Sequence, residues 1–196
     1  MAQSSIARFK LVVIGGSAGS LDIMLRIAAD IPANTQVSFI LVLHRKSGQH
    51  SIFTELLSDK TRLPVKEVKD KEPILPGTIY VAPCDYHLLL EQDHTFSLAV
   101  SERVHYSRPS IDVTFESAAS LYNDALIGIL LSGANADGAE GMKAISRHGG
   151  FTIVQLPATA EIGYMPQQAL NIMAPVKVLD GMKIAHFLHG LLSSGK

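Results

Sequence analysis

The stretch Leu11–Ser20, L-V-V-I-G-G-S-A-G-S, decides the fold, because a run of apolar residues ends there abruptly in glycines that surround one serine, Ser17. The run at 10–14 is short, continuous and rich in β-branched residues, which is typical of a strand buried on both faces of a parallel sheet. The apolar positions that follow Ser20 recur at helical spacing and stop near Pro32. The stretch therefore predicts a strand, a glycine-rich turn and a helix, in that order.

The turn itself admits two interpretations. Gly15, Ser17 and Gly19 match the G-x-S-x-G spacing of a nucleophile elbow, in which small neighbours let a serine expose its hydroxyl above the strand. A glycine-rich turn between a strand and a helix is also typical of phosphate binding through free N–H groups at the helix N-terminus. A dinucleotide site is the weaker hypothesis, because Ser17 stands where the G-x-G-x-x-G pattern needs its second glycine.

Length and composition limit the class of protein. The 196 residues, 47% hydrophobic and 18% charged, predict one packed domain over 1–196. No run approaches the roughly 18 consecutive apolar residues of a membrane span. A net charge of −1 with both signs scattered along the chain offers no basic face for nucleic acid. The single cysteine, Cys84, excludes an internal disulfide, and without a secretory signal we expect the protein in the cytoplasm.

Apolar strands alternate with amphipathic helices along the rest of the chain. Arg108, Pro109 and Ser110 are expected to open a helix, with Pro109 at a position where its missing N–H costs little, and Met165 with Pro166 is expected to interrupt a short helix. The segments 87–90 and 96–100 are expected to form an antiparallel hairpin. Further strands are expected at 37–43, 64–68, 78–82, 125–131, 151–156 and 176–179, with helices at 51–60, 110–122, 139–148 and 181–192. The alternation predicts an α/β fold, a doubly wound and mainly parallel Rossmann-like sheet with an added antiparallel hairpin.

Three of the apolar strands end on residue types that acyl transfer requires. Ser17 follows the first strand, His44 the second, and Asp137 the strand at 125–131. Ligands of open α/β sheets bind beyond the carboxyl ends of the strands, where the strand order reverses, so these side chains converge if the strand at 125–131 neighbours the first. Ser17 would then attack a carbonyl, His44 would take its proton, and Asp137 would orient the imidazole.

An oxyanion formed by such an attack needs fixed hydrogen-bond donors. The backbone N–H of Ala18, at the positive end of the first helix, is one candidate, and Ala134 in the loop at 133–135 is a second. No pair of histidines has the spacing of metal ligands on a helix, so neither a metal nor another cofactor is expected.

Structural explanations for the three residues remain open. Ser17 could serve only as a hydrogen-bonding residue of the helix entry, and His44 could be a solvated residue at a strand end. Asp137, with Glu140 three residues later, resembles a capping box for the helix that follows.

Six segments of the sequence resemble the catalytic domain of the chemotaxis protein-glutamate methylesterase (CheB) family, from Phe9 to about Leu192. They are V-I-G-G-S-A-G at 13–19, V-L-H at 42–44, Y-V-A-P-C-D-Y-H-L at 80–88, R-P-S-I-D-V-T-F-E-S-A-A at 108–119, L-S-G-A-N-A-D-G-A-E-G-M at 131–142 and G-Y-M-P-Q-Q-A at 163–169. The resemblance implies hydrolysis of γ-glutamyl methyl esters on the cytoplasmic helices of chemoreceptors, releasing methanol, with glutamine deamidation as a related activity. It also implies that Ser17, His44 and Asp137 are nucleophile, base and acid.

The sequence departs from the usual pattern of this family in several places. The family usually carries an N-terminal receiver domain; none is expected here, so a separate regulatory partner could replace it. Ala18 stands where threonine is common, and Ala134 where methionine is typical.

The residues that would meet the substrate are less well defined. Arg45, Lys46 and Arg108 could meet an acidic receptor surface or simply be solvated. Met165 is a further candidate for substrate contact. These departures keep open a different class of function, a receptor-binding or signalling adaptor with the same fold and no hydrolase activity.

Overall fold

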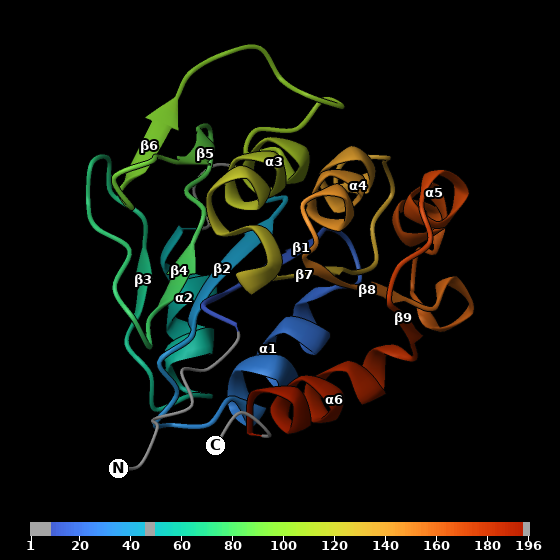
Figure 1. Cartoon of the computed structure of the whole chain (residues 1–196), viewed down its shortest axis with the longest axis horizontal. Helices are drawn as coiled ribbons and strands as arrows, with labels where there is room; N and C mark the ends of the chain where they lie inside the picture. The colour runs from blue at the N-terminus through green and yellow to red at the C-terminus, as the bar shows by residue number, and fades with distance from the viewer. Residues whose placement is uncertain (1–8, 46–49, 194–196) are drawn as a thin grey trace.

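The computed structural model describes residues 9–45 and 50–193, which form one parallel sheet of seven strands and a two-stranded antiparallel sheet (Figure 1). The strands are β1 (Leu11–Gly16), β2 (Ser38–Leu43), β3 (Val65–Glu67), β4 (Ile79–Val81), β5 (His87–Leu90), β6 (Phe96–Ala99), β7 (Leu126–Leu130), β8 (Phe151–Gln155) and β9 (Lys177–Leu179). The helices are α1 (Leu21–Asp30), α2 (His50–Ser58), α3 (Ile111–Tyr122), α4 (Ala139–Arg147), α5 (Tyr164–Ile172) and α6 (Gly181–Ser193), with short 3₁₀ turns at Asn123–Ala125 and Pro157–Thr159. The doubly wound α/β prediction is confirmed.

The order of strands in the large sheet is β3-β4-β2-β1-β7-β8-β9, and every pairing in it is parallel. The chain runs outward from β1 through β2 and then returns to β7 on the opposite side of β1. The reversal of strand order therefore lies between β1 and β7, which meets the condition set for the three side chains to converge, and the carboxyl ends of β1, β2 and β7 are adjacent.

Helices cover both faces of the sheet, which explains why its strands read as continuous apolar runs. The helices α1 and α6 lie on one face, and α3, α4 and α5 on the other (Figure 1). Successive residues of β1 alternate between two apolar cores. Val12 and Ile14 pack in the core under α1 and α6, whereas Leu11 and Val13 pack in the core under α3 and α4.

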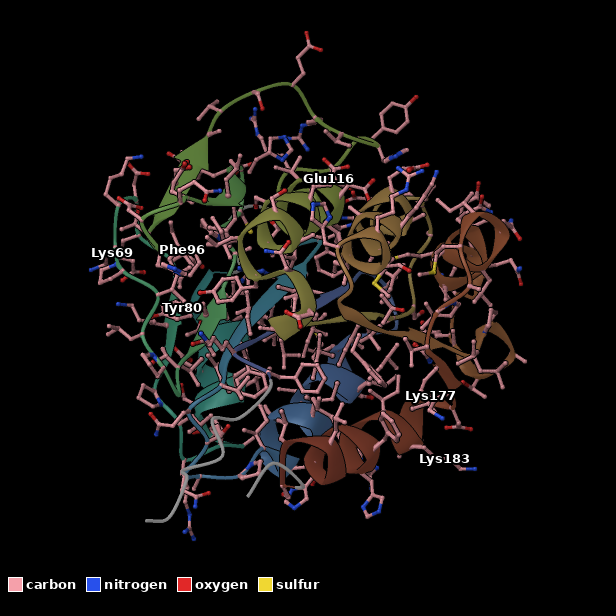
Figure 2. All side chains as sticks on the ribbon, in the orientation of Figure 1. Lys69, Tyr80, Phe96, Glu116, Lys177 and Lys183 are labelled. Atoms are coloured by element: carbon pink, nitrogen blue, oxygen red, sulfur yellow. The ribbon has the colours of Figure 1, made fainter. Side chains whose placement is uncertain are left out.

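The hairpin β5–β6 is attached to the edge of the sheet by aromatic packing and by α3. The ring centroids of Tyr80 in β4 and Phe96 in β6 are 4.8 Å apart in an edge-to-face arrangement, and the two labelled side chains lie together in Figure 2. The hydroxyl of Thr114 in α3 donates to the carbonyl of Leu88 at 2.8 Å. From the hairpin the chain arches through 100–110 before it enters α3 (Figure 1).

Two prolines lie elsewhere in their helices than the sequence predicted. Pro109 precedes the N-cap of α3, which is Ser110, instead of lying in the first turn. α5 begins at Tyr164, so Met165 and Pro166 lie in its first turn and do not interrupt it. Proline is tolerated there because the first N–H groups of a helix have no partner inside it. Among residues 9–45 and 50–193, no helix is long and apolar enough to cross a membrane.

Candidate functional site

Ser17 lies in a tight turn directly after β1. The carbonyl of Ser17 accepts the backbone N–H of Ser20 at 3.1 Å and the hydroxyl of Ser20 at 2.6 Å. Gly19 has a φ of 78°, a left-handed conformation that glycine adopts without strain at this position of a turn. The N–H of Ser17 donates to the carbonyl of Ser132 at 2.9 Å, which fixes the turn to the end of β7.

The hydroxyl of Ser17 is half-buried and has no hydrogen-bond partner in the part of the chain that the structure describes. It lines a cavity of about 520 Å³ together with Ala18, His44 and apolar side chains of α2. The N–H of Ala18 likewise donates to no acceptor among the described residues. A hydroxyl that lines a cavity beside an N–H without an acceptor, just before a helix, is an arrangement that nucleophilic attack on a carbonyl can use.

His44 and Asp137 are in direct contact although 93 residues separate them. Nε2 of His44 lies 2.8 Å from Oδ2 of Asp137. The side chain of His44 is 12% exposed, whereas that of Asp137 is completely buried. The N–H of His44 donates to the carbonyl of Gly16 at 3.2 Å, which continues the pairing of β2 with β1 and holds the imidazole beside the Ser17 turn.

Asp137 is held by the N-terminus of α3. Its carboxylate accepts the N–H of Ile111 at 2.7 Å, the N–H of Asp112 at 3.0 Å and the hydroxyl of Ser110 at 2.7 Å. Burial alone raises the pKa of Asp137, but the hydrogen bonds from His44 and from these N–H groups outweigh it and hold the pKa below its ordinary value. Asp137 is therefore ionised where it meets His44.

The capping-box interpretation of Asp137 is wrong. The N-cap of α4 is Gly138, with a φ of 101°. The carboxylate of Asp112 accepts the N–H of Gly138 at 2.8 Å and the N–H of Gly141 at 2.7 Å, so Asp112 caps α4 instead. Glu140 points outward and pairs with Lys143. Asp137 is a capping residue, but of a helix that begins 26 residues before it in the sequence.

The second ring nitrogen of His44 faces Ser107. Nδ1 lies 3.3 Å from the Ser107 hydroxyl, which also accepts a hydrogen bond from Nδ2 of Asn135 at 3.1 Å. The side chain of Asn135 in turn accepts the N–H of Asp137 at 3.2 Å. The structure thus joins His44 to Asp137 and places Ser17 and His44 on one cavity, with no hydrogen bond from the Ser17 hydroxyl to the imidazole.

The loop after β7 lies next to the Ser17 turn. The N–H of Gly133 donates to the carbonyl of Ile162, while Ala134 is exposed and its N–H has no acceptor among the described residues. Met165 is completely buried, and its N–H donates to the carbonyl of Gly133 at 3.0 Å. The predicted contact of Met165 with substrate is therefore wrong, because its side chain supports the Gly133 turn and has no exposed surface.

The cations near the site differ in their surroundings. Arg45 is not a solvated loop residue, since its side chain is only 4% exposed. Its guanidinium donates to the carbonyl of Ala82 at 3.0 Å, lies 3.4 Å from the carboxylate of Glu67 and covers the ring of Phe53. Arg108 donates to the carbonyl of Ser101 at 2.7 Å. Lys46 lies outside the described residues.

Several polar residues of the site were not predicted from the sequence. The hydroxyl of Ser132 donates to the carbonyl of Ala18 at 2.7 Å and accepts the N–H of Ile162 at 2.9 Å, which braces the nucleophile turn from below. Ser132 directly follows the apolar run of β7, and this position at the carboxyl end of a strand could have identified it as a site residue. For Ser107, Ser110 and Asn135, the contacts that bring them into the site join residues 27 to 63 positions apart, which local spacing does not show. Among the described residues, no cluster of three or more His, Cys, Asp or Glu could hold a metal ion.

Comparisons with known proteins agree with this fold. Residues 12–188 match the family model described as CheB methylesterase. A Leptospira interrogans protein with the provisional name protein-glutamate methylesterase/protein-glutamine glutaminase is 43% identical over 177 residues, 90% of this chain and 92% of that protein. A Pseudomonas aeruginosa protein, named protein-glutamate methylesterase/protein-glutamine glutaminase 3, is 35% identical over 179 residues, 91% of this chain and 53% of that protein. The chain thus spans about half the length of the Pseudomonas relative.

A solved structure has the same architecture. The crystal structure of the Thermotoga maritima CheB methylesterase catalytic domain matches with a TM-score of 0.88 and 31% sequence identity. The match covers 93% of this chain and 98% of that chain.

Proposed function

We propose that this chain, which belongs to the CheB methylesterase family, is a protein-glutamate methylesterase in which Ser17 is the nucleophile, His44 the general base and Asp137 the residue that orients the base. The observation that carries the proposal is the 2.8 Å contact between Nε2 of His44 and a completely buried carboxylate of Asp137. A carboxylate that served only to cap α3 would not need an imidazole beside it. A buried ionised carboxylate that also receives an imidazole N–H is what general base catalysis needs.

The first half of the reaction forms an acyl-enzyme. The hydroxyl oxygen of Ser17 attacks the ester carbonyl carbon of a methylated glutamate side chain while its proton passes to Nδ1 of His44. The N–H groups of Ala18 and Ala134 stabilise the oxyanion. The intermediate then expels methoxide, which takes the proton from His44 and leaves as methanol, and the glutamyl group remains as an ester of Ser17.

The second half regenerates the enzyme. Water gives a proton to Nδ1 of His44 and attacks the acyl carbon, and the returning proton releases the Ser17 hydroxyl and a free glutamate side chain. The same steps on a glutamine side chain would release ammonia in place of methanol. Asp137 stays ionised throughout and stabilises the imidazolium through Nε2–H, which the lowered pKa of its carboxyl favours.

The Ser17 hydroxyl and the His44 imidazole must come within hydrogen-bond distance for the reaction. Nδ1 of His44 now faces the hydroxyl of Ser107, and the Ser17 hydroxyl must turn toward it before a proton can pass. Rotation about χ1 of a half-buried serine that has no hydrogen-bond partner among the described residues is a small change. Catalytic hydrogen bonds are often loose until substrate binds.

The substrates that fit this chemistry are methylated glutamates on the cytoplasmic helices of chemoreceptors, which places the enzyme in the cytoplasm. Arg108 lies beside His44 and would face an acidic substrate, whereas the guanidinium of Arg45 is held by the carbonyl of Ala82 and by Glu67. A separate partner would regulate the activity. No observation favours the adaptor without hydrolase activity.

An active-site probe tests this assignment. A fluorophosphonate should label the protein at Ser17, located by mass spectrometry of the digested protein. Ser17→Ala should abolish the label, and Ser120→Ala, at an exposed position of α3, should keep it. A folded protein without labelling, or labelling at another serine only, would contradict the proposal and favour the adaptor.

A further inference from the structure

A second, smaller cavity opens beside His44. It has a volume of about 240 Å³ and is lined by Arg45, Arg103 and Arg108 together with His44, Tyr106 and Ser107. Because His44 and Arg45 also line the larger cavity of Ser17, the two cavities adjoin. A group bound in the smaller cavity would therefore lie next to the reacting ester.

Two of the three arginines have a carboxylate partner inside the protein. Arg45 lies 3.4 Å from Glu67, and Arg103 lies 3.7 Å from Asp85. These pairs reduce the positive charge that the two side chains offer to a ligand.

Arg108 has no such carboxylate partner among the described residues. Its Nη1 donates to the carbonyl of Ser101 at 2.7 Å. Its Nε is buried and donates to no acceptor among the described residues, and the guanidinium forms no ion pair with them. A buried donor without an acceptor is costly, so an arginine in this state at the wall of a cavity favours an anionic ligand there.

The other carboxylates near His44 are already engaged. Asp137 accepts hydrogen bonds from His44 and from the start of α3, and Asp112 accepts them from the start of α4 and lies 3.6 Å from His105. Neither is available to Arg108. Among residues 9–45 and 50–193, Arg108 therefore has no carboxylate partner, and a bound anion could supply one.

We propose that this cavity is a carboxylate subsite in which Arg108 holds an acidic side chain of the substrate, one helical turn or less from the methylated glutamate. The inference rests on the proposed function and adds a sequence preference to it. Side chains one turn apart on a helix have Cβ atoms about 5–6 Å from each other, which suits two adjoining cavities that share His44.

A pair of peptides tests the subsite. Both carry one γ-methyl glutamate, with a glutamate neighbour in one peptide and a glutamine neighbour in the other. The unmodified enzyme should show a kcat/KM about tenfold higher for the acidic peptide, as expected for one charged pair at a partly desolvated site. In Arg108→Gln the ratio should fall to about one, mainly through KM for the acidic peptide.

Two further variants separate recognition from general effects. Arg108→Lys keeps the charge and should retain part of the preference. Arg26→Gln removes the same charge from an exposed position of α1 and should leave the ratio unchanged. Equal losses on both peptides in Arg108→Gln, or an unmodified enzyme without preference, would overturn the subsite.

Binding to Ser17→Ala keeps this test separate from that of the esterase. This variant should bind the acidic peptide about tenfold more tightly than the neutral one, measured by fluorescence anisotropy, and the added Arg108→Gln change should remove the difference. Selective binding without methanol release by the unmodified enzyme would contradict the proposed function and leave the subsite standing. Methanol release with equal binding of both peptides would support the proposed function and contradict the subsite.

Discussion

Asp112 and Asp137 cap each other's helices. Asp137, just before α4, accepts the N–H groups of Ile111 and Asp112 at the start of α3, and Asp112, in α3, accepts those of Gly138 and Gly141 at the start of α4. Each carboxylate satisfies N–H groups that have no partner within their own helix. These reciprocal caps join the start of α3 to the start of α4. They thereby hold the carboxylate of Asp137, which contacts His44, in place.

The two carboxylates respond oppositely to pH. Burial is the main reason that the pKa of Asp112 rises from 3.8 to about 6, opposed by the N–H of Gly141 and increased by the nearby charge of Asp137. Because the folded protein then binds a proton more readily than the unfolded chain, the contribution of Asp112 to stability falls as pH rises from about 4 to 6. The contribution of Asp137, whose pKa is lowered, is present above its unfolded pKa and is lost as pH falls through its folded pKa.

Asp112→Asn should therefore become relatively more stable as pH rises. Asparagine keeps an oxygen for the N–H groups of α4 but carries no buried charge, so the difference in the free energy of unfolding between the variant and the parent should shift in favour of the variant by up to about 3 kcal/mol between pH 4 and 7. Urea unfolding at both pH values measures it, with exposed Asp59→Asn as the control. A difference that does not change with pH would contradict the role of burial.

Asp137→Asn should reduce turnover by about 10⁴-fold, because an amide holds the imidazole in the wrong tautomer. Steady-state hydrolysis of a γ-methyl glutamyl peptide measures the loss, with the fold checked by circular dichroism. Glu140→Gln, at an exposed position on α4, should leave turnover unchanged. If the folded Asp137→Asn protein lost less than about tenfold in turnover, the only role of Asp137 would be to cap α3.

Gly19→Ala should lower both stability and the reactivity of Ser17. At a φ of 78° an alanine costs about 1–2 kcal/mol, and its Cβ would lie 2.8 Å from the Ser132 hydroxyl that braces the turn. The labelling rate with a fluorophosphonate and the urea midpoint measure the two effects. Gly190→Ala, where a Cβ would meet no atom within 4 Å, should stabilise α6 by up to about 1 kcal/mol and leave labelling intact. Normal labelling of Gly19→Ala would show that the turn geometry is unimportant.

Ser107→Ala should accelerate labelling of Ser17. The Ser107 hydroxyl lies 3.3 Å from Nδ1 of His44, the atom that must receive the Ser17 proton, so the two hydroxyls compete for one lone pair. A hydrogen bond worth about 1 kcal/mol net corresponds to an increase of about fivefold in labelling rate. A slower rate in the variant would mean that Ser107 orients the imidazole and does not compete with Ser17.

The sequence predicted the parts of the fold that depend on local pattern. Buried parallel strands are continuous apolar runs, and those at β1, β2 and β7 were recognised with ends correct to within two residues. The place of β7 beside β1 is one order that the rules for α/β sheets allow, so the approach of Asp137 to His44 could be expected on that condition.

The errors concern residues whose partners are distant in the sequence. Asp137 was compared with Glu140 as a capping box, although its real partners begin α3. The sequence offers a receptor contact or solvation for Arg45, because nothing in the local pattern shows the carbonyl of Ala82 and the ring of Phe53 around its guanidinium. Local spacing reports the face of an element on which a residue lies, and the groups packed against that face come from the tertiary structure.

Release of methanol from a chemoreceptor fragment with γ-methyl glutamate side chains tests the central claim most directly, when the unmodified protein is compared with Ser17→Ala and with Ser120→Ala at the same concentration. The triad predicts release by the unmodified protein and by Ser120→Ala, and background release by Ser17→Ala. Equal release by all three proteins would contradict it.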